Sequence, residues 1–233
     1  MTALREESDV LVPEARMRVS TLLVGPTAPS LVMVLAHGAG AGMHHPFLES
    51  VAAGLAARGA ATFRYQFPYM ERGGGRPDAP ATLAATVRAA TTAARARFPD
   101  AVLIAGGKSL GGRMTSTAAA SAPLPGVRGL AFLGFPLHAP DRPARSRAEH
   151  LARVTAPMLF LQGTRDAFAD LDLLREALVP LGSRATLHLI DGGDHSFKVL
   201  KRSGRTPAEV LDELLDTLER WARGLPPQTE RLS

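Results

Sequence analysis

The chain has no cysteine and no long apolar run, and each absence excludes a class of protein. Without cysteine among its 233 residues, it forms no disulfide or cysteine-ligated zinc site, and it has no thiol nucleophile. No stretch reaches the roughly 18 apolar residues that cross a membrane. The opening residues, MTALREESDVLVPEARM, are polar and acidic, unlike a signal peptide. We therefore expect a cytoplasmic protein with no membrane partner.

The composition is that of an ordinary globular domain, with 45% hydrophobic and 21% charged residues. The formal net charge is +5, but no basic-aromatic run accompanies it, so we expect no nucleic-acid partner. The length suits a single domain over residues 1–233. We expect the first dozen residues, and the last several from Pro226 to Ser233, to be peripheral or flexible. The oligomeric state does not follow from the sequence.

Short apolar runs alternate with segments of helical periodicity. This alternation predicts a three-layer α/β/α sandwich around a mostly parallel sheet of about seven or eight strands. Catalytic groups in such a sheet gather where the strands end. The predicted strands cover residues 17–24, 31–36, 60–65, 101–106, 129–133, 158–161 and 185–190, and the predicted helices cover 46–58, 80–98, 110–121, 168–178 and 207–223.

The stretch Gly107-Lys108-Ser109-Leu110-Gly111 matches G-x-S-x-G between a predicted strand and a predicted helix. In that context a sharp turn exposes the serine hydroxyl, and the glycines let strand and helix pass close together. A glycine-rich turn capped by serine is the alternative. A phosphate-binding P-loop is excluded, because it would need glycine at Val102. Ser109 is therefore the candidate nucleophile.

A serine nucleophile needs a base to take its proton and an acid to orient the base. Asp166 lies in Gly-Thr-Arg-Asp after the strand at 158–161, and His195 lies in Gly-Gly-Asp-His after the strand at 185–190. The order Ser109, Asp166, His195 is typical of α/β-hydrolases. These three residues are the predicted triad.

Each partner of the serine has an alternative interpretation. The alternative for Asp166 is to cap the helix that begins near Phe168, in which case Asp141 is the reserve acid. The alternative for His195 is an ordinary loop histidine held by hydrogen bonds. Asp194 is interpreted as a turn residue beside the base.

The other histidines give no metal site. His150 lies in a surface-like polar stretch and His188 lies inside a predicted strand. His44 and His45 are adjacent, without a carboxylate or histidine pair at ligand spacing. We expect no metal and no cofactor.

The anionic intermediate of acyl transfer needs two N–H donors, which form an oxyanion hole. Leu110, directly after the serine, supplies the first. The second should come from the glycine-rich turn after the strand at 31–36, where we choose the amide of Ala39, with Gly40 as its neighbour. We expect His37 to brace this turn by hydrogen bonding. A nucleotide-binding loop is excluded, because the G-x-G-x-x-G spacing and an acidic ribose ligand are missing.

Several cations are predicted near the site. Lys108 and Arg113 flank the serine. Arg64, Arg72 and Arg76 lie on or after a strand that should end near the crevice. A substrate that carries a carboxylate or phosphate is one interpretation, and scattered surface charge is the other. We take Gly40, Lys108 and Arg113 as candidate substrate-binding residues.

Six motifs together resemble the α/β-hydrolase superfamily, in particular its small dienelactone-hydrolase-like members. The resemblance runs from about Leu31 to Pro207 and is closer still to the KANL/Tex hydrolase-like group. The motifs are HGAGAGMHHPF, RYQFPYMERG, GGKSLGGRM, LGFPLHAPDRP, GTRDAF and DHSFK.

This resemblance implies that Ser109, Asp166 and His195 are nucleophile, acid and base, and that the amides of Ala39 and Leu110 form the oxyanion hole. We expect a serine hydrolase of the carboxylesterase or thioesterase type, acting on a small soluble substrate. Because the stretch between residues 134 and 157 is short, we expect no large lid.

A protein-interaction module without catalysis is the alternative, since some eukaryotic relatives by this resemblance are subunits of assemblies. The loops Met70–Pro77 and His138–Arg147 would then be the contact surfaces.

Overall fold

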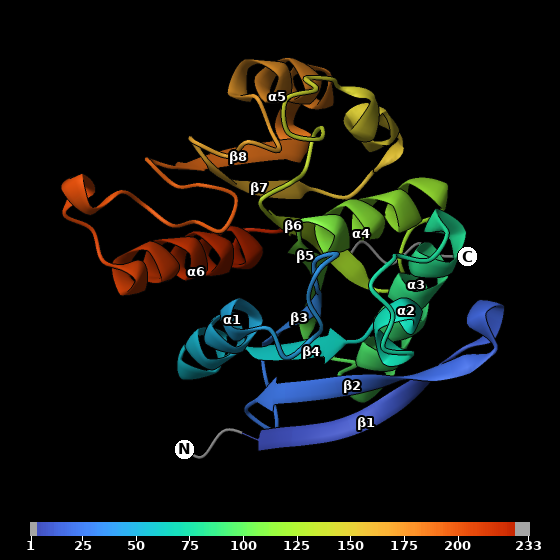
Figure 1. Cartoon of the computed structure of the whole chain (residues 1–233). Helices are drawn as coiled ribbons and strands as arrows, with labels where there is room; N and C mark the ends of the chain where they lie inside the picture. Colours follow the sequence, from blue (N-terminus) through green and yellow to red (C-terminus); the bar gives the residue numbers. More distant parts are fainter. Residues whose placement is uncertain (1–3, 227–233) are drawn as a thin grey trace.

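The computed structural model describes residues 4–226, which form one eight-stranded sheet covered by helices (Figure 1). The strand order is β1-β2-β4-β3-β5-β6-β7-β8. β2 runs antiparallel to both β1 and β4, and every other neighbouring pair is parallel. The strands are β1 Leu4–Val12, β2 Met17–Gly25, β3 Leu31–Ala36, β4 Ala61–Tyr65, β5 Val102–Lys108, β6 Val127–Leu133, β7 Met158–Gly163 and β8 Ala185–Ile190.

Helices cover both faces of the sheet. α3, α4 and α5 bury apolar side chains on one face, and α1 and α6 bury theirs on the other. Each sheet face therefore packs against a helix layer, which is why the central strands are apolar on both sides. The helices are α1 Pro46–Ala57, α2 Pro68–Glu71, α3 Pro80–Arg97, α4 Leu110–Ser121, α5 Leu171–Leu178 and α6 Pro207–Arg223, with 3-10 segments η1 Pro13–Ala15, η2 Ser146–Arg153, η3 Val179–Arg184 and η4 Lys201–Ser203.

This architecture confirms the predicted fold class, and the predicted strands and helices are all present within a few residues of their expected ends. The expectation that the first dozen residues are peripheral or flexible is only half right. β1 is indeed the edge strand, but it forms a nine-residue ladder with β2, from Leu4 opposite Gly25 to Val12 opposite Met17. Its charged run was not recognised as a strand, although charged side chains are typical of exposed sheet edges.

Two further segments differ from expectation. α5 begins at Leu171 rather than near Phe168, and the four-residue helix α2 follows β4 directly. Residues 227–233 of the expected flexible tail lie outside the described residues. Within residues 4–226, no helix combines the length and the apolar character that a membrane crossing requires.

The parallel strands bring six loops to one edge of the sheet. The loops after β3, β4, β5, β6, β7 and β8 all leave from carboxyl ends, which in a parallel sheet lie side by side. The connection from β6 to β7 contains only η2 and forms no large lid, as predicted. This edge carries the candidate site.

Candidate active site

Ser109 occupies a strained turn between β5 and α4. Its backbone has φ 51° and ψ −115°, a left-handed conformation that is uncommon for residues other than glycine. The flanking glycines make the turn sterically feasible. A Cβ on Gly107 would lie 2.5 Å from the carbonyl oxygen of Ala36, and one on Gly111 would lie 2.6 Å from that of His37. The G-x-S-x-G pattern therefore places the hydroxyl at the tip of a tight strand-to-helix turn.

The structure brings together all three residues of the predicted triad. His195 Nε2 lies 2.9 Å from Ser109 Oγ, and His195 Nδ1 lies 2.7 Å from Asp166 Oδ2. A carboxylate only accepts, so Nδ1 carries the hydrogen and donates it to Asp166. Nε2 is then the free acceptor that faces the serine hydroxyl. This arrangement can move a proton from serine to histidine.

The Asp166 carboxylate is fully held by its surroundings. Its side chain has 0% exposure. Gln162 Nε2 donates to Oδ2 at 2.6 Å, and the backbone N–H of Phe168 donates to Oδ1 at 2.8 Å. The Phe168 ring also lies against the His195 ring, with centroids 4.4 Å apart. The sequence analysis missed Gln162 and Phe168. A polar residue near the end of an otherwise apolar strand was the available signal for Gln162.

Hydrogen bonds distinguish Asp166 from the other aspartates that were considered as the acid of the triad. The cap of α5 is Asp170, whose Oδ1 accepts from the N–H groups two and three residues further on. Asp141 is exposed on its loop. Asp194 Oδ1 accepts from the amides of Ser196 and Lys198, which confirms its role as a turn residue. Of these aspartates, Asp166 is the one that contacts the histidine.

A second serine-histidine contact has a different character. Ser116 Oγ lies 2.7 Å from His150 Nε2, but Ser116 is fully buried in α4 and its hydroxyl donates to the carbonyl of Arg113. Burial, reinforced by nearby arginines, lowers the pKa of His150 to about 4. His150 was expected in a surface-like stretch, yet it is half-buried against α4. This contact joins η2 to α4 and has no access to a substrate.

The glycine-rich turn after β3 lies beside the serine. A Cβ on Gly38 would be 3.8 Å from Ser109 Cβ, and the following residues Ala39 and Gly40 are exposed. Leu110 is the first residue of α4, so its N–H has no partner inside the helix. Among the described residues, no backbone carbonyl accepts the N–H of Ala39. Within residues 4–226, the amides of Ala39 and Leu110 thus both lack a backbone acceptor.

His37 braces this turn as predicted. Its Nδ1 lies 2.8 Å from the Gly38 carbonyl, and its Nε2 accepts the N–H of Phe67 at 3.0 Å. Burial lowers the pKa of His37 to about 4, which keeps the ring neutral and able to accept. Tyr69 Oη donates to the Ala39 carbonyl at 2.9 Å. The segment after β4 therefore fixes the backbone of the turn.

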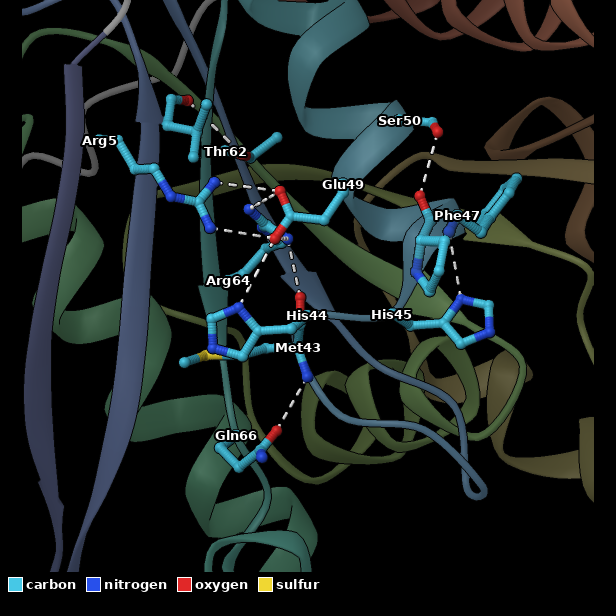
Figure 2. Close-up of polar contacts among 12 residues, drawn as sticks. Arg5, Met43, His44, His45, Phe47, Glu49, Ser50, Thr62, Arg64 and Gln66 are labelled. Atoms are coloured by element: carbon cyan, nitrogen blue, oxygen red, sulfur yellow. Dashed lines mark hydrogen bonds and ion pairs between the residues drawn. The ribbon is translucent and has the colours of Figure 1, made fainter.

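An ion pair between the buried Arg64 and the partly exposed Glu49 anchors the rest of the same loop (Figure 2). Arg64 is 0% exposed, and its guanidinium donates to the Met43 carbonyl at 2.8 Å and to Glu49 at 3.0 Å. Arg5 binds Glu49 from the other side at 3.1 Å, and Gln66 accepts the N–H of Met43. Arg64 was expected on a strand that ends near the crevice. It is instead a buried anchor, because Glu49 on α1 neutralises it.

The candidate substrate-binding residues are in three different environments. Gly40 is exposed. Arg113 is half-buried, and burial and the neighbouring Arg147 lower its pKa. Lys108 Nζ is buried and has no hydrogen-bond partner among residues 4–226. The ammonium is therefore enclosed by protein atoms. Of the two remaining cations, Arg72 pairs with Asp78 and Arg76 is exposed.

Comparison with known proteins places the whole architecture in one family. The model of the alpha/beta hydrolase domain family matches residues 29–223. The chain belongs to this α/β-hydrolase family. Solved structures agree with the assignment. A dienelactone hydrolase from Anabaena variabilis is 22% identical, with a TM-score of 0.75 over 97% of this chain and 99% of that one. An α/β serine hydrolase without a lid from Xanthomonas campestris is 20% identical, with a TM-score of 0.72 over 98% of each chain.

Such identities show that the α/β-hydrolase fold is shared. The site of this α/β-hydrolase holds no cluster of three or more potential metal ligands within the described chain. Its polar groups instead form the relay from Asp166 through His195 to Ser109.

Proposed function

We propose that this α/β-hydrolase is a serine hydrolase that cleaves an ester or thioester bond in a small soluble substrate. One observation carries the proposal. His195 bridges Ser109 and a buried carboxylate at 2.9 Å and 2.7 Å, and the serine sits on a strained turn at the sheet edge where active sites of this architecture lie. Asp166 is the acid of the triad, and its position behind the histidine favours one tautomer.

In the proposed mechanism, Ser109 Oγ attacks the substrate carbonyl carbon while His195 Nε2 takes the hydroxyl proton. The tetrahedral intermediate collapses, and the leaving alcohol or thiol departs with that proton, leaving an acyl-serine ester. Water then attacks the acyl carbon, with His195 again taking a proton. The carboxylic acid leaves and Ser109 regains its hydrogen. Asp166 stabilises the imidazolium in both halves.

The amides of Ala39 and Leu110 are the proposed oxyanion donors. Leu110 directly follows Ser109 and begins α4, where the helix dipole favours negative charge, and Ala39 follows Gly38, which approaches Ser109. Gly40 borders the same open side of the site. These features support binding of the developing oxyanion between the turn after β3 and the start of α4.

The substrate class follows from the openness of the site. No large lid covers Ser109, which favours small substrates over long chains. The dienelactone hydrolase among the structural neighbours supports an ester substrate. The six quoted motifs further lead us to place the chain in the KANL/Tex hydrolase-like group. The cytoplasmic location stays a prediction.

A protein-interaction module is the competing function. One of its expected surfaces begins at His138, but this residue is only 5% exposed and its ring accepts the N–H of Asp170. Because the loop His138–Arg147 begins at a buried residue, less of its surface is accessible to a partner protein. Catalysis is favoured by the backbone amides of Ala39 and Leu110, which have no backbone acceptor in the described part of the chain, and by the hydrogen bonds that join Asp166, His195 and Ser109.

Intact-mass spectrometry after exposure to a fluorophosphonate tests the two functions. We expect one adduct on the natural chain and on Ser116→Ala, because Ser116 is not activated. Ser109→Ala should carry none, and His195→Ala should react at least about a thousandfold more slowly. An adduct that persists on Ser109→Ala would refute Ser109 as nucleophile. No adduct on the natural chain between about pH 6 and 9 would favour the interaction module.

A further inference from the structure

Lys108 is a charged side chain of this site that the proposed mechanism leaves unused. It is the last residue of β5 and directly precedes the nucleophile. Its Nζ has no exposed surface and no hydrogen-bond partner in the described part of the chain. A buried ammonium without acceptors is costly to the fold. Fold stability therefore does not explain why a lysine occupies position 108.

The ammonium lies beside the histidine of the triad. A Cβ on Gly134 would be 3.0 Å from Lys108 Nζ and 3.5 Å from His195 Nδ1, so these two nitrogens are no more than about 7 Å apart. The Phe197 ring centroid lies 5.6 Å from Nζ. The ammonium is thus enclosed near His195, between Gly134 and Phe197.

Few charges surround this pair. The titratable groups that bear on Lys108 from the loops around it, within residues 4–226, are Asp166 after β7 and Asp194 and His195 after β8. The residues that approach it from the loops after β3 and β6 are Gly38 and Gly134, which carry no charge. Asp166 is already bound by other donors, and Asp194 by backbone amides. The Lys108 charge and the Asp166 carboxylate, which lies 2.7 Å from Nδ1, therefore act on His195 in opposite directions.

We propose that Lys108 is a positioning residue that acts on His195 through its charge. The ammonium disfavours the imidazolium and so keeps Nε2 free to accept the Ser109 proton at lower pH than it otherwise would. The inference rests on the proposed function, because it assigns a task to the base of that mechanism. Lys108 neither touches the substrate nor exchanges a proton with it.

The same charge has a cost during the reaction, because attack by Ser109 creates the imidazolium that Lys108 opposes. Burial lowers the pKa of Lys108 to about 8, although Asp166 and Asp194 counteract part of this shift. Below that pH the charge is present. Above it the charge is lost, and the imidazolium forms more easily. The reaction rate of the natural chain should rise in two steps, the second of them near pH 8, where Lys108 loses its proton.

The rate of fluorophosphonate labelling as a function of pH tests this proposal. Lys108→Met has similar length and no charge. It should show a single rise, displaced upward by about one to two pH units relative to the first rise of the natural chain. Lys108→Arg keeps a charge that does not titrate in this range. It should retain the low first rise and lose the second. The exposed Lys201→Met is the matched control and should follow the natural chain.

A merely structural role for Lys108 predicts a different result. Labelling by Lys108→Met and by a second neutral variant, Lys108→Gln, would then fall by the same factor at every pH, and this outcome overturns the proposal. Nitrogen-15 NMR of the His195 ring gives a readout that needs no reaction. An upward displacement of its titration in the neutral variants supports the proposal even in a chain that the probe does not label. An unchanged titration refutes it, whether or not Ser109 is a nucleophile.

Discussion

Replacing Glu49 by glutamine should remove a measurable part of the stability of the chain. Hydrogen bonds from Arg5 and from the buried Arg64 lower the pKa of Glu49 from 4.5 to about 2. A shift of that size corresponds to about 3 kcal/mol. Because the Glu49 side chain is 32% exposed and Arg5 is on the surface, solvent screening reduces the expected loss to about 2 kcal/mol at neutral pH. Glutamine still accepts a hydrogen bond, but it leaves Arg64 without its counter-charge.

The pH dependence has a definite sign. A carboxylate with a lowered pKa stabilises the fold fully above its unfolded pKa of 4.5, and this contribution is lost as pH falls towards 2. The difference between the natural chain and Glu49→Gln should therefore be about 2 kcal/mol at about pH 7 and shrink steadily below about pH 4.5.

Urea denaturation followed by circular dichroism at several pH values measures this difference. Glu149→Gln is the matched control, since Glu149 is exposed and has no ion-pair partner within the described residues. Its free energy of unfolding should stay within about 0.5 kcal/mol of the natural value. A gap between Glu49→Gln and the natural chain that stays constant from about pH 7 to 3 would refute the ion-pair argument.

Two further substitutions test the parts that hold the turn and the nucleophile. Tyr69→Phe removes the hydrogen bond to the Ala39 carbonyl, and it should slow fluorophosphonate labelling roughly tenfold while shifting the melting temperature by only a few degrees. Unchanged labelling would show that Tyr69 does not position the turn. Gly111→Ala should destabilise the chain by at least about 3 kcal/mol in thermal denaturation, because its Cβ meets the His37 carbonyl. Gly75→Ala, with no atom within 4 Å of the new Cβ, should melt like the natural chain, and equal melting of both variants would contradict the steric argument.

The serine, the aspartate and the histidine could be predicted from sequence because each follows an apolar strand directly. In a parallel sheet, a residue just after a strand lies at a known edge. This local information brought Ser109, Asp166 and His195 together without knowledge of any side-chain contact. The fold class followed from the same alternation of strands and helices. β1 was missed because an edge strand buries little and can be as polar as a loop.

The cations could not be placed in the same way. Arg64 and Lys108 were both expected near substrate, since an arginine or lysine on a strand near the crevice usually points to solvent. Arg64 turns inward because Glu49 on α1 supplies a counter-charge. Lys108 is buried by the packing of Gly134 and Phe197 around it. Both outcomes depend on residues distant in the chain, and strand periodicity contains no information about them.

The site therefore has two halves that are held by different forces. The nucleophile is fixed locally, by close contacts of glycines with the backbone of β3. The turn with Ala39 is fixed at a distance, by Arg64, Gln66, Tyr69 and the neutral ring of His37. Loss of these distant contacts would misplace an oxyanion donor while leaving the triad geometry intact. A chain of this family can thus lose turnover without losing its serine, histidine or aspartate, so catalysis must be judged from the segment after β4 as well as from the triad.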